Sequence, residues 1–230
     1  MTGEPDPALT GITGFPSIAR MASKGNTLAT LVSAFAFAFS GVSFYETVLK
    51  QTNLKVYVTD TLSYTRDPYG GYEVIVLPLT IANSGAHDGA VVTLELSVRN
   101  IESGRSETFS SAYTADAQYF GGRDDVASRV KRPKLPFSPL SISGRGAYAG
   151  TILFYSPDGR DGRDHKVLIE PQSKVELTLR ILTPPPDGWI DRLLTTAYKP
   201  IKLTGEIGAF LPGALYAGDT VRVRLSQPSP

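Results

Sequence analysis

The most apolar stretch of the chain is residues 27–45, TLATLVSAFAFAFSGVSFY, which carries no charge between Lys24 and Glu46. Nineteen helical residues extend roughly 28 Å at a rise of 1.5 Å per residue, close to the ~30 Å hydrocarbon core of a bilayer. A lone apolar span must be helical in lipid, because an unpaired peptide group finds no partner there. The pattern therefore predicts one transmembrane helix, acting as a signal anchor, within residues 24–50.

Two alternatives to a membrane anchor stay open for this stretch. Ala36-Phe37-Ala38 fits the small–x–small cleavage rule and Arg20 and Lys24 supply a basic flank, as in a cleaved signal peptide. Against cleavage, the apolar residues continue to Tyr45 and the n-region would be long. The second alternative is a buried core helix of a soluble protein.

Small side chains recur at intervals of four and three along one side of the predicted helix: Ala29, Ser33, Ala36, Ser40 and Ser43. Such a row lets two helix backbones approach closely in lipid. We call it the small-residue seam, and it predicts self-association of the helix. The alternative is that alanine and serine are simply common in membrane spans.

From residue 54 the pattern changes to short alternating apolar runs separated by turn residues, which is typical of β-strands. Strands are expected at residues 54–64, 72–82, 90–99, 105–114, 147–155, 166–170, 174–183, 201–210 and 220–225, with a short helix at 189–198. Pro78 cannot donate to a ladder, so it predicts a bulge or an unpaired side in its strand. No helical crossover joins these runs, which favours antiparallel pairing.

Strands at this spacing predict two packed antiparallel sheets, that is, a β-sandwich over residues 54–230. Residues 77–85 (LPLTIANSG) followed by 91–96 (VVTLEL) resemble the strand–loop–strand hairpins of bacterial immunoglobulin-like domains. The whole layout resembles bacterial membrane-anchored proteins that carry such a domain. The resemblance implies a mainly β protein with an immunoglobulin-like sandwich after the helix, and it transfers no functional residue.

Composition and motifs exclude several function classes. Lys and Arg number 23 against 22 Asp and Glu, a balance that argues against a dedicated nucleic-acid binder. The absence of cysteine excludes disulfides, thiolate nucleophiles and cysteine zinc sites. No G-x-S-x-G, H-E-x-x-H or Walker A motif occurs, and His87 and His165 lie far apart in predicted loops. We therefore predict no catalytic chemistry and no cofactor.

Two segments lack any hydrophobic period. Residues 1–23 contain three prolines and three glycines and are predicted to be a disordered tail. Residues 115–146 are an irregular insertion, and because long insertions in compact domains are often functional, they are the first candidate for a working surface. They contain a basic cluster, Arg129, Lys131, Arg132 and Lys134. This cluster predicts contact with anionic lipid or another polyanion, and the alternative is a solvated loop.

Residues 158–164 (DGRDGRD) bring three carboxylates together: Asp158, Asp161 and Asp164. Calcium loops place oxygen ligands on alternate residues and close with a later glutamate. Here the spacing is three, and Arg160 and Arg163 would oppose a cation. These aspartates are therefore weak metal candidates, and a solvated turn with Asp–Arg pairs is the favoured alternative.

These patterns predict a single-pass cell-membrane protein whose β-domain serves protein–protein contact, with a protein partner or a second copy bound through the helix. The first alternative is a membrane-anchored hydrolase or ligand-binding β-domain with its site in loops 115–146 and 156–165. A pocket lined by His165, Asp158 and Asp161 would favour it. The second alternative is a structural subunit of a larger membrane complex.

The orientation of the predicted span is not fixed by charge. Arg20 and Lys24 on one side are balanced by Lys50 and Lys55 on the other, so the positive-inside rule is tied. We expect the β-domain to lie outside the cytoplasm, because the short amino-terminal tail is the easier part to retain.

Overall fold

The computed structural model describes residues 18–67, 71–115, 135–157, 167–185, 198–216 and 219–226 of the 230, with side chains from Thr27 onward. The chain divides into two compact units, Met1–Thr47 and Val48–Pro230. Each unit has its own architecture. The predictions for the tail before residue 18, for the basic cluster and for the DGRDGRD segment concern residues outside the described part.

The first unit is a long helix, α1 (Ile18–Phe44), which is followed by a π-helical turn, η1 (Tyr45–Leu49). α1 begins ahead of residue 24, where the anchor was predicted to start. The segment Thr27–Leu49 is long and apolar enough to cross a membrane, and none of its most apolar window is buried. The side chain of Phe37 is 82% exposed. A core helix of a soluble protein would bury such side chains.

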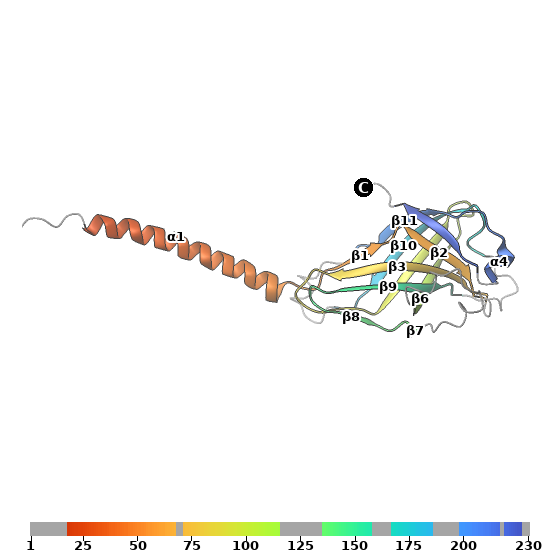
Figure 1. Cartoon of the computed structure of the whole chain (residues 1–230), viewed down its shortest axis with the longest axis horizontal. Helices are drawn as coiled ribbons and strands as arrows, with labels where there is room; N and C mark the ends of the chain where they lie inside the picture. The colour runs from red at the N-terminus through yellow and green to blue at the C-terminus, as the bar shows by residue number, and fades with distance from the viewer. Residues whose placement is uncertain are drawn as a thin grey trace, which may run out of the picture. The chain divides into compact units, whose positions relative to one another are not determined.

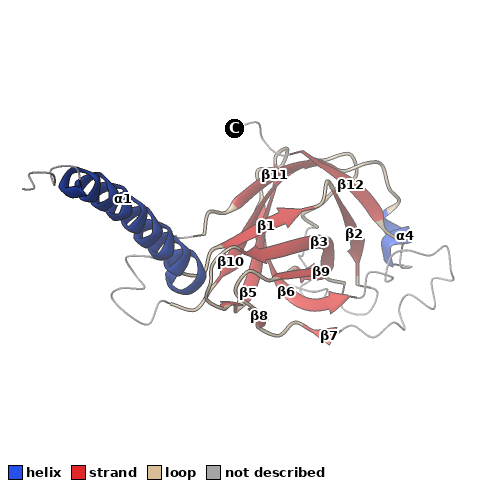
Figure 2. Ribbon diagram, turned by 60° about the vertical axis from the view of Figure 1, so that its left-hand side comes forward, coloured by secondary structure: helices blue, strands red, loops and turns tan. Residues whose placement is uncertain are grey.

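The second unit is a closed antiparallel barrel of eight strands (Figures 1 and 2). Each strand hydrogen-bonds to a neighbour on both sides, and the last of them pairs with the first. In order around the wall the strands are β3 (Glu73–Asn83), β2 (Thr61–Arg66), β12 (Val221–Ser226), β11 (Ile201–Glu206), β10 (Lys174–Leu182), β5 (Thr93–Asn100), β6 (Ser106–Ala115) and β9 (Ala147–Tyr155).

The predicted immunoglobulin-like β-sandwich is therefore wrong. A sandwich consists of two facing sheets, each of which keeps its own edge strands. Here β9 pairs with β3 along Val74–Ala82 and with β6 along Ser110–Ala115, so that one sheet closes on itself. The same inward–outward alternation of side chains serves both architectures, and only the long-range pairing distinguishes them.

Short strands extend the wall beside β3 and β6. β1 (Leu54–Val58) and β2 pair with different halves of the same edge of β3, and Pro78 lies between these two pairings. This position confirms the prediction that Pro78 occupies an unpaired side of its strand, because proline has no N–H to donate. β7 (Leu135–Pro136) continues the wall beside β6.

Several predicted strands have different limits in the structure. The run 54–64 comprises parts of two strands, β1 and β2, and the run 90–99 includes parts of β4 (Gly89–Val91) and β5. The predicted strand at 166–170 is wrong, since its described residues form a bend without strand pairing, and the predicted strand at 201–210 ends at Glu206. The predicted helix at 189–198 lies outside the described residues apart from Tyr198.

Side chains from all eight strands fill the barrel interior, so that it forms a core and not a channel. The largest fully buried rings are those of Tyr64, Phe109 and Phe154. Val74, Val76 and Leu153 form a second buried cluster on the other face of β3 and β9. This second cluster explains why β3 is apolar on both faces.

Both ends of the barrel are closed by packed segments. At one end β4 pairs with β8 (Leu140–Ile142), and Val91 and Ile142 join the core. At the other end Leu168, Ile169 and the short helix α4 (Pro212–Tyr216) cover the interior, and we call Leu168 and Ile169 the plug. Figure 1 shows β8 and α4 at opposite ends. We call the first the tether end, because the chain enters the barrel there, and the second the distal end.

Candidate functional site

The chain enters the barrel through residues 50–53, which we call the tether segment, and hydrogen bonds hold both of its ends. Ala86 N donates to the Lys50 carbonyl oxygen at 2.8 Å, and Ser84 N donates to the Asn53 carbonyl oxygen at 2.9 Å. The segment is therefore part of the folded barrel and not a free linker.

The middle of the tether segment is held equally closely. Thr52 Oγ1 donates to the Asp88 carbonyl oxygen at 2.8 Å. Gly85 packs against the backbone of Gln51, where a Cβ on Gly85 would lie 2.1 Å from the Gln51 carbonyl oxygen. No side chain fits at Gly85 unless this backbone moves, so the close approach requires glycine.

The buried side chain of Asn83 joins three segments at the tether end. Its Oδ1 accepts from Asn53 N at 3.2 Å and from Gly85 N at 3.0 Å. Its Nδ2 donates to the His87 carbonyl oxygen at 2.8 Å and to the Ile142 carbonyl oxygen at 3.3 Å. One amide group thus satisfies backbone groups that would otherwise be buried without partners.

A third segment completes this arrangement. Arg145 N donates to the Gly85 carbonyl oxygen at 2.9 Å, and Gly144 N donates to Asp88 Oδ1 at 2.9 Å. Arg145 has a positive φ of 60°, which is uncommon for a residue with a side chain. We define the tether collar as residues 50–53, 83–88 and 142–146.

The distal end contains a buried carboxylate, Glu73, whose two oxygens accept three hydrogen bonds. The donors are Tyr64 Oη at 2.7 Å, Leu168 N at 2.9 Å and Ile169 N at 3.0 Å. Arg66 Nε donates to the Tyr64 hydroxyl at 3.3 Å. Burial, together with the charge of Glu73, raises the pKa of Tyr64 well above its ordinary value.

Glu73 also forms hydrogen bonds to Ser156, which precedes the plug in the chain. Its N–H donates to Ser156 Oγ at 3.0 Å, and Ser156 N donates to its carbonyl oxygen at 3.0 Å. Asn100 Nδ2 donates to the Leu168 carbonyl oxygen at 2.9 Å. These contacts hold Ser156 and Leu168, which lie on either side of segment 158–166, so Glu73 and Asn100 have a structural role.

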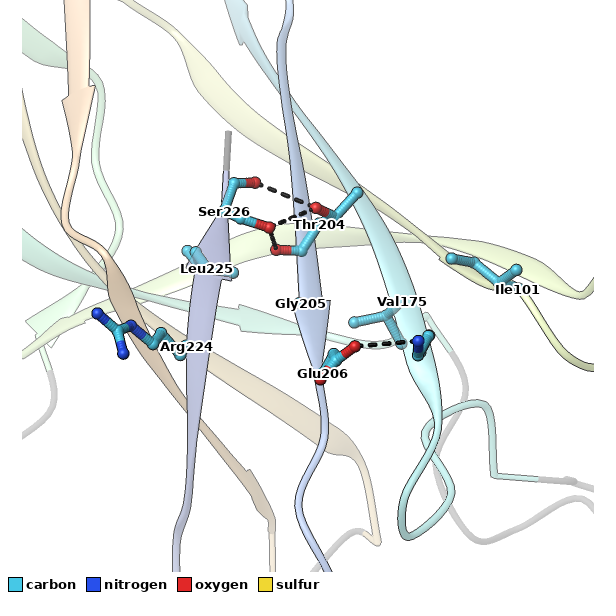
Figure 3. A pocket seen from close by; sticks show the side chains of 9 residues that line it. Ile101, Val175, Thr204, Gly205, Glu206, Arg224, Leu225 and Ser226 are labelled. Atoms are coloured by element: carbon cyan, nitrogen blue, oxygen red, sulfur yellow. Dashed lines mark hydrogen bonds and ion pairs between the residues drawn. The ribbon is translucent and has the colours of Figure 1, made fainter. Parts of the chain in front are cut away.

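A shallow depression of about 370 Å³ lies on β10, β11 and β12 (Figure 3). Thr204 Oγ1 and Ser226 Oγ are 2.8 Å apart, and Lys174 Nζ lies 3.0 Å from Glu206 Oε1. The two hydroxyls bond to each other and not to a general base, so the depression offers polar contacts without an activated nucleophile. Its lining residues are Ile101, Lys174, Val175, Thr204, Gly205, Glu206, Arg224, Leu225 and Ser226.

The predicted site residues have different outcomes. The small-residue seam lies on α1 with its side chains exposed, and Ser40 Oγ donates to the Ala36 carbonyl oxygen at 2.8 Å; contact with a second chain there stays a prediction. The part of the chain that the structure describes contains no group of three or more metal-binding side chains. Outside that part lie Asp158, Asp161, Asp164, His165, Arg129, Lys131, Arg132 and Lys134.

Sequence reasoning missed Asn83 and Glu73 as organising residues. Asn83 was part of an expected hairpin loop, whereas its partners include Asn53, thirty residues earlier. The available signal for Glu73 was a single charged residue at the start of the long apolar run in β3. Such a residue in a buried strand must have hydrogen-bond partners, although the sequence does not say which.

Comparison with known proteins gives little further information. No protein-family model matches the chain, and the curated proteins contain no match. Among solved structures, the chain is similar to a crystal structure of a Bordetella pertussis protein designated ApaA, with 16% identity and a TM-score of 0.27. The match covers 58% of this chain and 82% of that chain. At this score the likeness assigns neither fold nor function.

Proposed function

We propose that the protein is a non-enzymatic, membrane-anchored binding module, in which Thr27–Leu49 spans a bilayer and the barrel contacts a protein partner outside the cytoplasm. The observation that carries the proposal is the exposure of the apolar side chains on this segment, including Phe35, Phe37 and Phe39. Exposed aromatic rings on a helix of this length are typical of a membrane span, where lipid surrounds them.

The barrel supports a binding role through its outer surface. Packed side chains fill the described interior, and segments close both ends. Small-molecule sites are usually concave and bury most of their ligand. The depression on β10, β11 and β12 is shallow and lined by both apolar and polar side chains, which suits the surface of a protein partner better.

The anchor is tested by alkaline extraction of membranes that contain the full-length chain. We expect the wild type to stay in the membrane and to be released only by detergent. A Phe35→Arg/Phe39→Arg variant is expected to be extractable, because each charge at the centre of a span costs roughly 2.5–3.5 kcal/mol. Phe35→Leu/Phe39→Leu is the matched control and should stay. A wild type that is soluble without detergent, or cleaved after Ala38, would overturn the anchor.

The binding role is tested by photo-crosslinking in intact cells. A photoreactive residue replaces Ser226 in the depression, and the control variant carries it at Thr108, which is exposed on β6. We expect one adduct of defined mass from position 226 and none from position 108. Absence of a position-dependent adduct here and at other exposed positions of the wall would contradict the proposed protein contact.

A further inference from the structure

We propose that the tether end of the barrel rests on the headgroup layer of an anionic bilayer. This inference depends on the proposed membrane span, and not on which side of the membrane the barrel occupies, and it adds a lipid-binding surface on the barrel. Three features carry it: the length of the tether, the position of the collar, and the side chains exposed around the collar.

The tether is too short to let the barrel leave the membrane surface. Phe44 is the last residue of α1, and Lys50 is already bonded to the barrel through Ala86 N. Six peptide steps separate them, so the two residues lie within about 20 Å of each other even when the chain is fully extended. This limit follows from chain length alone and holds for any angle between helix and barrel.

Only one end of the barrel is held in this way. The tether segment is bound to residues 83–88, which follow the last residue of β3. β3 has eleven residues and extends roughly 35 Å at about 3.4 Å per residue, so the distal end is that much farther along the wall. A rigid collar therefore keeps the tether end, and not the distal end, within reach of the headgroups.

The tether end exposes apolar side chains suited to this position. Val92, at the turn into β5, and Leu182, at the end of β10, are both exposed, and Val92 N donates to the Leu182 carbonyl oxygen at 2.8 Å. Apolar side chains of this kind insert at the boundary between headgroups and acyl chains.

Exposed cations at the same end give the surface its preference for anionic lipid. Lys55 pairs with Ala82, next to the collar, and Arg145 belongs to the collar itself; both side chains are exposed. The collar also contains one side chain of opposite charge, that of Asp88, whose carboxylate accepts a hydrogen bond from Gly144 N. Basic residues near the bilayer are attracted by the negative surface potential of anionic lipids.

Contact between the tether end and lipid would also determine which end of the barrel faces away from the membrane. Lys174 begins β10 and Glu206 ends β11, both toward the distal end, and both line the depression described above. A barrel that rests on its tether end therefore presents this depression away from the lipid, where a protein partner can reach it.

The test uses the full-length chain in nanodiscs of phosphatidylcholine and phosphatidylserine. Because the native chain has no cysteine, each variant carries a single fluorophore. Val92→Cys and Ile101→Cys form a matched pair, since the native side chains are 45% and 46% exposed at the tether and distal ends. Phe37→Cys reports the span. We expect a headgroup nitroxide to quench position 92 and not position 101, and an acyl-chain nitroxide to quench position 37.

The outcomes separate the two proposals. Quenching at position 37 with equal signals at 92 and 101 would overturn the docked barrel and leave the anchor intact. Absence of quenching at position 37 would overturn the anchor, and the docked barrel with it. In nanodiscs of phosphatidylcholine alone, or with Lys55→Glu, quenching at 92 is expected to weaken. An unchanged signal in both cases would refute the role of lipid charge.

Discussion

Replacing Glu73 tests the hydrogen bonds that close the distal end of the barrel. The residue is only 1% exposed, and its carboxylate accepts hydrogen bonds from Tyr64, Leu168 and Ile169. The last two lie in the segment that closes the distal end. Glu73→Ala removes the acceptor and leaves three buried donors without a partner, so we expect both the plug and the barrel to lose stability.

The magnitude follows from these three bonds. Each buried donor that loses its acceptor costs about 1–3 kcal/mol, and water that enters the gap recovers part of this cost. We therefore expect Glu73→Ala to lower the free energy of unfolding by roughly 4 kcal/mol. For a domain of 150–250 residues this corresponds to a fall in Tm of roughly 8–16 °C. Glu73→Gln keeps one acceptor oxygen and should cost about half as much.

The assay is urea unfolding of the full-length chain in detergent, followed by circular dichroism, with Glu176→Ala as the control. Glu176 lies on the outer face of β10, 3.5 Å from Arg99, and both side chains are about half exposed. Exposed pairs contribute about 0–1 kcal/mol, so this control should change little. If Glu73→Ala costs no more than the control, the carboxylate does not hold the plug and the reasoning is refuted.

Three further predictions concern other buried groups. Gly85→Ala should cost about 3 kcal/mol and speed amide exchange in residues 50–53, whereas Gly208→Ala, with no atom within 4 Å, should be neutral. Tyr198→Phe should leave stability at pH 7 unchanged or higher, because among the described residues its buried hydroxyl has no partner. Burial raises the pKa of Tyr198 to about 12, whereas the side chain in the unfolded chain loses its proton near pH 10. Urea unfolding should therefore show that the free energy of unfolding falls between about pH 10 and 12. This fall should be smaller in the Tyr198→Phe variant.

The individual strands could be predicted because their side-chain alternation is a local property. The run 147–155 has the limits of β9, and 174–183 differs from β10 by one residue. In β10 the alternating residues Val175, Leu177, Leu179 and Ile181 all lie in the core. A strand with one buried face shows this period whichever neighbours it has.

The closure of the sheet could not be predicted from the same information. Barrel and sandwich require identical alternation, and they differ here only in that β9 pairs with both β3 and β6. The double pairing depends on contacts between residues that are far apart in sequence. The apolar residues on both faces of β3 are consistent with burial on two sides, and the second cluster around Val74 and Val76 provides the burial on the outer face.

The tether collar was missed for a similar reason. Residues 83–85 end a run that resembles a strand–loop–strand hairpin. That local pattern does not contain the hydrogen bonds that join these residues to residues 50–53. Gly85 was the available clue, because a glycine without a positive φ often marks a close approach of two backbones. Which backbone approaches it, here that of Gln51, is a tertiary property.

The packed interior and the bonded tether together limit where a partner can bind. Side chains occupy the described lumen, so a partner must meet the outer wall or the loops at one end. If lipid covers the tether end, the outer wall and the distal end remain, and the depression on β10, β11 and β12 belongs to that region. The crosslinking and quenching experiments therefore constrain each other. A partner can be captured at position 226 only if lipid does not cover that position. A barrel that rests on its tether end meets this condition.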